Sequence, residues 1–285
     1  MEKRLKLSPP FWSSLILIAS QAFTLYVAFR EKDFIEANRI TPPEISLEVS
    51  VAYFFGAVAL LGVILFLVPI SKLRIALRIM FAFLFSWGMF IALGLSLPIP
   101  AASLISVAGG LMWLFMPRVW LHNLLMIFAL VSLGSVFGFL LSPWTAIFLM
   151  LVISIYDILA VRFGYMLWLA KRLSDSETLP AFVIPRRTSS WNLNLRQAGF
   201  KQLFEDSSAE REFSILGGGD IGFPLLLVVS VFFSYGFTSS AIVAGFSVLG
   251  LIGAYWIQLF FLRGKPMPAL PPIFFMSLIG FLIIY

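Results

Sequence analysis

Long apolar stretches, separated by short polar breaks, occupy most of this chain of 285 residues. Most stretches hold roughly 18–24 residues, which is enough for a helix to cross the hydrocarbon core of a bilayer. The pattern predicts nine membrane-spanning helices, with ends placed to within about 2–4 residues. They lie near residues 11–29, 49–69, 79–97, 101–116, 121–141, 144–163, 213–233, 239–262 and 268–285.

The composition indicates the same fold class. Hydrophobic residues make up 60% of the chain and charged residues only 12%, which is far from the balance of a soluble globular domain. We therefore predict an all-α polytopic membrane protein, integral and multi-pass, in which 1–285 form a single membrane domain. Six helices occupy about 11–170 and three occupy about 213–285. Residues 171–212, with seven basic and six acidic side chains, are predicted to form a mobile cytoplasmic loop.

The distribution of basic residues predicts the orientation of these helices. If the N-terminus is cytoplasmic, only Arg30, Lys32 and Arg39 of the 20 Lys and Arg residues fall on the outer side. Such a bias toward the cytoplasmic loops is the positive-inside rule. An odd number of spans then puts the C-terminus outside. The net charge of +6 is therefore interpreted as a record of topology, and no nucleic-acid partner is expected.

Two residue types are too scarce for several kinds of site. The chain has no cysteine, so thiol nucleophiles, disulfides and Cys-based metal sites are excluded. A zinc hydrolase needs several nitrogen or sulfur ligands, and the chain offers one histidine, His122. We expect no metal and no cofactor. His122 lies near a predicted helix end and is interpreted as an interfacial polar residue.

Asp157 and Asp220 lie inside long apolar stretches, whereas the other twelve of the 14 acidic residues lie in segments predicted to face water. A carboxylate in hydrocarbon is costly and usually functional. At about 1.5 Å per residue, Asp157 is predicted to lie ~8 Å, and Asp220 ~10 Å, from the cytoplasmic ends of the sixth and seventh helices. Consecutive antiparallel helices are usually neighbours, so we predict that the two carboxyl groups face each other.

Close carboxyl groups in a low dielectric cannot both ionise cheaply, so such a pair tends to keep one proton between them. An aspartic protease uses this state, because one group activates water while the other protonates the substrate carbonyl. Two other interpretations are open at this point. Each aspartate could be a buried structural residue satisfied by Tyr, Ser or backbone groups, or the pair could line a proton or cation pathway.

Three short motifs carry a family resemblance. Tyr156-Asp157 is a Tyr-Asp pair, Gly217-Gly218-Gly219-Asp220 has the form Gly-x-Gly-Asp, and Pro268-Ala269-Leu270 begins the ninth predicted helix. In this order, on the sixth, seventh and ninth helices, they resemble the presenilin and signal-peptide-peptidase class of intramembrane aspartyl proteases. The proline directly after the third motif, Pro271, is a further feature that resembles presenilins. A prepilin-peptidase-like enzyme shares a Gly-x-Gly-Asp site but leaves the other two motifs unexplained.

The resemblance implies an aspartic-type endopeptidase that cuts transmembrane-helix proteins within the lipid bilayer, with Asp157 and Asp220 as catalytic residues. It implies that Tyr156, Gly217, Gly218, Gly219, Pro268, Ala269 and Leu270 shape the site and help to hold substrate. The chain departs from presenilins in carrying Gly218 where they have leucine, and in its shorter loop. Its size suggests a microbial homologue that works without accessory subunits. The alternative function is a proton-coupled transporter or cation leak channel.

Overall fold

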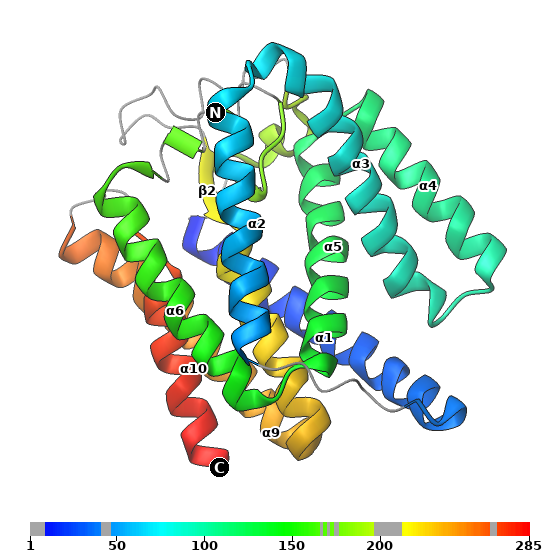
Figure 1. The fold of residues 1–285 in the computed structure, drawn as a ribbon, viewed down its shortest axis with the longest axis vertical. Coiled ribbons are helices and arrows are strands. Elements are labelled where there is room, and N and C mark those ends of the chain that lie inside the picture. The colour runs from blue at the N-terminus through cyan, green and yellow to red at the C-terminus, as the bar shows by residue number, and fades with distance from the viewer. Residues whose placement is uncertain are drawn as a thin grey trace, which may run out of the picture.

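A computed structural model describes residues 9–40, 47–165, 168–169, 172–173, 177–196, 213–262 and 267–285. The described chain forms a helical bundle with a small two-stranded sheet at one end (Figure 1). Its helices are α1 (Pro9–Asn38), α2 (Leu47–Leu67), α3 (Ile70–Gly94), α4 (Ile99–Phe115), α5 (Val119–Leu140), α6 (Pro143–Arg162), α9 (Gly218–Phe260) and α10 (Leu270–Ile284), with a short 3₁₀ helix η1 (Thr188–Asn192).

The helices follow the predicted apolar stretches, but several begin or end elsewhere. Helix α1 continues through the charged segment after Arg30 to Asn38, and α3 begins at Ile70, so that Lys72, Arg74 and Arg78 lie on a helix. Helices α1, α5, α6 and α9, and residues Lys72–Gly94 of α3, are long and apolar enough to cross a membrane. Helices α4 and α10 are apolar but shorter.

Helix α9 is interrupted at Gly236, whose φ of 84° and ψ of −178° are not helical. Side chains rarely tolerate this backbone conformation, and glycine adopts it without a steric cost. The interruption separates helical residues 218–235 from 237–260. The sequence predicts a break in the same place, between residues 233 and 239.

The fold is not entirely helical, which corrects two expectations. Strand β1 (Ala181–Pro185) and strand β2 (Phe213–Gly217) pair antiparallel, with Ala181 opposite Gly217 and Pro185 opposite Phe213. Residues 213–217 were expected to start the seventh helix, and β1 lies in the segment predicted to be a mobile loop. All five β1 residues are buried, because the strand packs between β2 and the bundle rather than extending into water.

Close helix packing places α9 at the centre of the bundle, in contact with α1, α5, α6 and α10. A Cβ atom added at Gly134 or Gly138 of α5 would lie 2.9 Å from Leu225 Cβ or 2.5 Å from Val229 Cβ on α9. Glycine at these positions therefore lets the two helix backbones approach, as small residues commonly do between membrane helices. This packing fixes the first turns of α9, which carry the candidate site.

Candidate active site

Asp220 is the third residue of α9, and its carboxylate is held by the helix start itself. Gly217 is the N-cap residue, and its backbone N–H donates to the Asp220 carboxylate. This bond is one half of a capping box, in which a side chain at the third helical position satisfies the N-cap N–H. The expected helix start near residue 213 is wrong, because strand β2 occupies residues 213–217 and Asp220 is the third residue of its helix rather than the eighth. The predicted depth of ~10 Å from the cytoplasmic side assumed that helix start and stays a prediction.

The start of α10 supplies a second donor to the same carboxylate. Ala269 is the N-cap of α10 and Leu270 its first residue, and the backbone N–H of Leu270 donates to Asp220. The Leu270 side chain is buried and packs in the apolar cluster that contains Leu226 and Leu227 of α9. Pro268 is half-buried at the entry to this turn. The structure thus joins two of the three motifs at one carboxyl group.

Asp157 belongs to α6, which packs against both α9 and α10. Its side chain is buried, and its charge acts on Asp220, so the two carboxyl groups lie within electrostatic reach of each other. Tyr156, the preceding residue, is half-buried and interacts electrostatically with Asp157. The Tyr-Asp motif therefore lies within electrostatic range of the Gly-x-Gly-Asp motif. That the two carboxyl groups face each other stays a prediction.

Of the motif glycines, Gly218 is the most tightly enclosed. Its N–H donates to the carbonyl of Pro180 over 2.9 Å, and a Cβ at this position would lie 2.8 Å from the same oxygen and 3.1 Å from Met126 Cε. Gly219 is exposed, and a Cβ there would meet the Phe223 ring at 3.4 Å. The chain between β2 and α9 is therefore packed against the residue that precedes β1.

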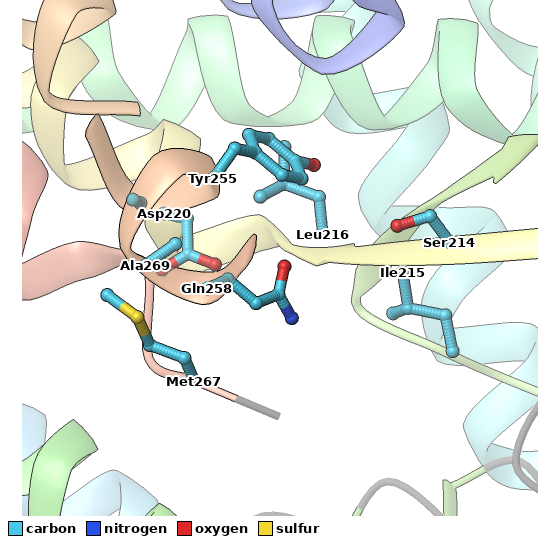
Figure 2. Close-up of a pocket in the computed structure, with 9 residues that line it drawn as sticks. Ser214, Ile215, Leu216, Asp220, Tyr255, Gln258, Met267 and Ala269 are labelled. Carbon is cyan, nitrogen blue, oxygen red and sulfur yellow. The ribbon is translucent and has the colours of Figure 1, made fainter. Parts of the chain in front are cut away.

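A pocket of about 90 Å³ opens beside Asp220. Strand β2, the end of α9 and the turn before α10 form its wall, with the lining residues Ser214, Ile215, Leu216, Asp220, Ala254, Tyr255, Gln258, Met267 and Ala269. Figure 2 shows the Gln258 amide directed into the space between Asp220 and strand residues Ser214 and Ile215. Groups that accept and donate hydrogen bonds therefore surround the carboxyl group on the side of β2.

Tyr255 connects this pocket to two other elements. Its hydroxyl group hydrogen-bonds to Ser13 of α1 at 2.5 Å and to the Ser214 side chain of β2. Sequence reasoning identified none of Ser214, Tyr255 and Gln258. Gln258 could have been noticed in the sequence, because it is a polar amide within an apolar helix. Ser214 and Tyr255 could not, because serine and tyrosine are common in segments like theirs.

His122 also differs from its predicted role. It is fully buried rather than interfacial, and it contacts the backbone of β1. Within the described residues, no group of three His, Cys, Asp or Glu side chains is arranged to hold a metal ion.

Comparison with known proteins bears on this arrangement. The family model described as "Signal-peptide peptidase, presenilin aspartyl protease" matches residues 13–285. The chain belongs to this family. The resemblance expected from the three motifs is therefore confirmed, and with it the assignment to integral, multi-pass membrane proteins. Comparison with curated proteins finds no match.

Two solved structures share the fold. A presenilin family intramembrane aspartate protease in space group C222 has a TM-score of 0.64 at 18% sequence identity, covering 97% of this chain and 98% of that one. A presenilin family intramembrane aspartate protease in space group P2 has a TM-score of 0.57 at 19% identity, covering 98% of both chains. The presenilin-type architecture therefore extends over nearly the full chain, including the first five helices, where no motif indicates it.

Proposed function

We propose that this protein is an intramembrane aspartic endopeptidase that hydrolyses peptide bonds in the transmembrane helices of its substrates. The observation that carries the proposal is that the charge of Asp157 acts on Asp220, which lines a pocket, in a member of an aspartyl protease family. The general acid and general base of the reaction are these two aspartates. No cofactor enters the proposed chemistry.

The proposed reaction needs one proton shared by the pair. The ionised aspartate removes a proton from a water molecule as that water attacks the peptide carbonyl carbon. The protonated aspartate donates to the carbonyl oxygen, and a later proton transfer to the nitrogen releases the new amine. The two N–H groups that hold Asp220, from Gly217 and Leu270, fix one carboxyl group in position for this exchange.

A helical substrate hides its peptide carbonyls in hydrogen bonds between residues i and i−4, so it must unwind before water can attack. Strand β2 offers a place for the unwound segment. One of its edges pairs with β1, and Ser214, Ile215 and Leu216 line the pocket at Asp220. We propose that an extended substrate adds as a strand to the opposite edge of β2, with its backbone bonded to β2 and its scissile bond near Asp220.

We propose in addition that α9 crosses the bilayer twice, with its turn at Gly236, which completes nine spans. The N-terminus is then cytoplasmic and the C-terminus outside, in agreement with the basic residues. A chain of this size resembles a microbial homologue, and we propose that it acts without accessory subunits. The cytoplasmic face of the bundle supplies the water.

The test is incubation of the detergent-purified protein with a single-span transmembrane peptide, followed by mass spectrometry of the products. Asp157→Asn and Asp220→Asn should each reduce the cleavage rate by about 10³-fold or more, since each removes one partner of the acid–base pair. Glu31→Gln is the matched control, because Glu31 is a half-buried acid of α1 that bonds to Ser135 of α5, away from the pocket. Wild-type cleavage by either aspartate variant would refute the assignment.

The transporter or cation leak alternative makes the opposite prediction. In liposomes it requires ion flux that depends on Asp157 and Asp220, with no peptide products. Measuring flux and fragments on the same preparation separates the two functions.

A further inference from the structure

Two consecutive polar residues, His122 and Asn123, are buried in the first turns of α5, with 0% and 3% of their surface exposed. Burying a histidine ring and an amide in an apolar bundle is costly unless each polar atom finds a partner. Asn123 finds its partners in the backbone of β1, and His122 finds one partner there and another in Trp113. The family motifs include neither residue, and the proposed chemistry does not use them.

Asn123 binds β1 as a neighbouring strand would. Its Nδ2 donates to the carbonyl of Val183 over 2.7 Å, and its Oδ1 accepts the N–H of Val183 over 3.0 Å. A single side chain therefore satisfies both backbone groups of one buried strand residue. Because successive residues of a strand direct their N–H and C=O groups to opposite edges, Val183 and Ala181, two residues apart, face the same edge, toward α5.

His122 binds the next available group on this edge. Trp113 of α4 donates its indole N–H to His122 Nδ1 over 3.2 Å, so the ring proton belongs on Nε2. Nε2 lies 2.9 Å from the carbonyl oxygen of Ala181 and donates to it. The hydrogen bond from the Trp113 indole thus fixes the neutral tautomer of His122 that carries its proton on Nε2. This is the tautomer that can donate to the β1 backbone, and a hydrogen bond at one ring nitrogen commonly sets the state of the other in this way.

The sheet connects this attachment to the junction of β2 and α9, residues Gly217 and Gly218, next to Asp220. The strand register puts Ala181 opposite Gly217 and Val183 opposite Ile215. Gly217 is the N-cap whose N–H donates to Asp220, and the N–H of the next residue, Gly218, donates to Pro180 at the start of β1. Strands β1 and β2 therefore link the α5 side chains to the turn that holds the carboxyl group of Asp220.

We propose that His122 and Asn123 are positioning residues for the cleavage reaction, which hold strand β1 on α5 and thereby set the place of β2 and Asp220. The inference rests on the proposed protease function. The two residues do not touch the reacting atoms. They act through the sheet, so their loss should affect the rate of the chemical step and the choice of scissile bond more than substrate affinity.

The test compares four variants of the full chain, with kcat, KM and the distribution of cleavage sites measured on one transmembrane peptide. Asn123→Ala should lower kcat at least tenfold, change KM less than threefold and add new cleavage sites. His122→Asn should behave similarly, because its shorter amide cannot reach Ala181. His122→Gln should restore kcat to within threefold of the unaltered protein, because its amide nitrogen occupies the place of Nε2.

The matched control is Ser132→Ala. Ser132 is equally buried on α5 and donates to the carbonyl of Gly88 on α3, but it does not bond to β1. This variant should retain kcat and the original cleavage site. An equal loss in Ser132→Ala, or unchanged kcat and cleavage site in correctly folded Asn123→Ala, would overturn the proposal. If Asn123→Ala fails to fold, the proposal is tested by comparing kcat between His122→Gln and His122→Asn, and equal kcat values would overturn it.

Amide hydrogen exchange of residues 181–185 provides a readout that does not depend on activity. Asn123→Ala should increase exchange there by tenfold or more, and Ser132→Ala should not. Unchanged exchange in Asn123→Ala would overturn the proposed attachment. If the unaltered protein yields no peptide fragments, the proposed function fails instead, and the exchange measurement still decides whether α5 holds the strand.

Discussion

The backbone N–H of Leu270 donates a hydrogen bond to the carboxylate of Asp220. The position of the helix start thus determines the environment of the carboxyl group, and the buried Leu270 side chain determines the position of the helix start. The Pro-Ala-Leu motif acts here through a main-chain group, and its leucine side chain is the anchor that holds this group in place.

Leu270→Ala should therefore weaken both stability and activity. Removing a buried leucine side chain costs about 2–4 kcal/mol in unfolding free energy through lost contacts and the cavity left behind. The relaxed turn should also displace the N–H from Asp220 and lower the cleavage rate. Thermal unfolding in detergent and a cleavage assay measure the two effects. Leu282→Ala on the same helix, at 55% exposure, is the control and should change stability by less than about 0.5 kcal/mol.

Gly218→Ala tests the contact between the first residue of α9 and Pro180, the residue before β1. The added Cβ would lie 2.8 Å from the backbone oxygen of Pro180, which cannot rotate away as a side chain can. We expect a loss of about 1–3 kcal/mol from this overpacking, together with slower cleavage. Gly245→Ala on α9 has no atom within 4 Å of the new Cβ and should stabilise its helix by up to about 1 kcal/mol. Effects of the same sign would contradict this account.

Glu177→Gln tests the attachment of the segment before β1 to α3. The Glu177 carboxylate pairs with Arg196 at 3.0 Å and with Arg74 and Arg78 at 3.7 Å each. Its neutralisation leaves three guanidinium groups without this shared counter-charge, at an expected cost of about 1–2 kcal/mol at low salt. The difference should shrink in about 1 M salt, where the Debye length falls to about 3 Å.

The comparison for Glu177 is Glu36→Gln. Glu36 pairs with Lys32 at 3.8 Å across one helical turn, and both side chains are well exposed. Its removal should cost at most about 0.5 kcal/mol. Equal effects of the two substitutions on thermal unfolding would mean that the three-arginine arrangement contributes no more than a surface pair.

Hydropathy was sufficient to locate the helices and both aspartates, because a long apolar stretch and a carboxylate within it are local properties of the sequence. It did not reveal β2. Residues Phe213–Gly217 are about as apolar as the helix that follows, so hydropathy does not separate the strand from the helix. The glycine run 217–219 lies at the boundary, but it was interpreted only as part of a motif. The partner strand β1 lies more than twenty residues earlier, among prolines and charges typical of a loop.

The same physical reason explains the mistaken interpretation of His122. Its sequence neighbourhood is that of an interfacial helix end, and the groups that satisfy its two ring nitrogens in the fold belong to Trp113 and Ala181. Asp220 was identified from its surroundings in the sequence, but its two N–H donors were not, since Leu270 approaches only after α9 and α10 pack together.

The pairing of β1 with β2 has a consequence for chain integrity. Both strands lie between Asp157 and Asp220 in the sequence, β1 before and β2 after residues 186–212. Helices α9 and α10 pack against helices that precede β1, namely α1, α5 and α6. A single backbone cut between the strands would therefore leave two fragments that remain associated as one unit, each contributing one member of the aspartate pair.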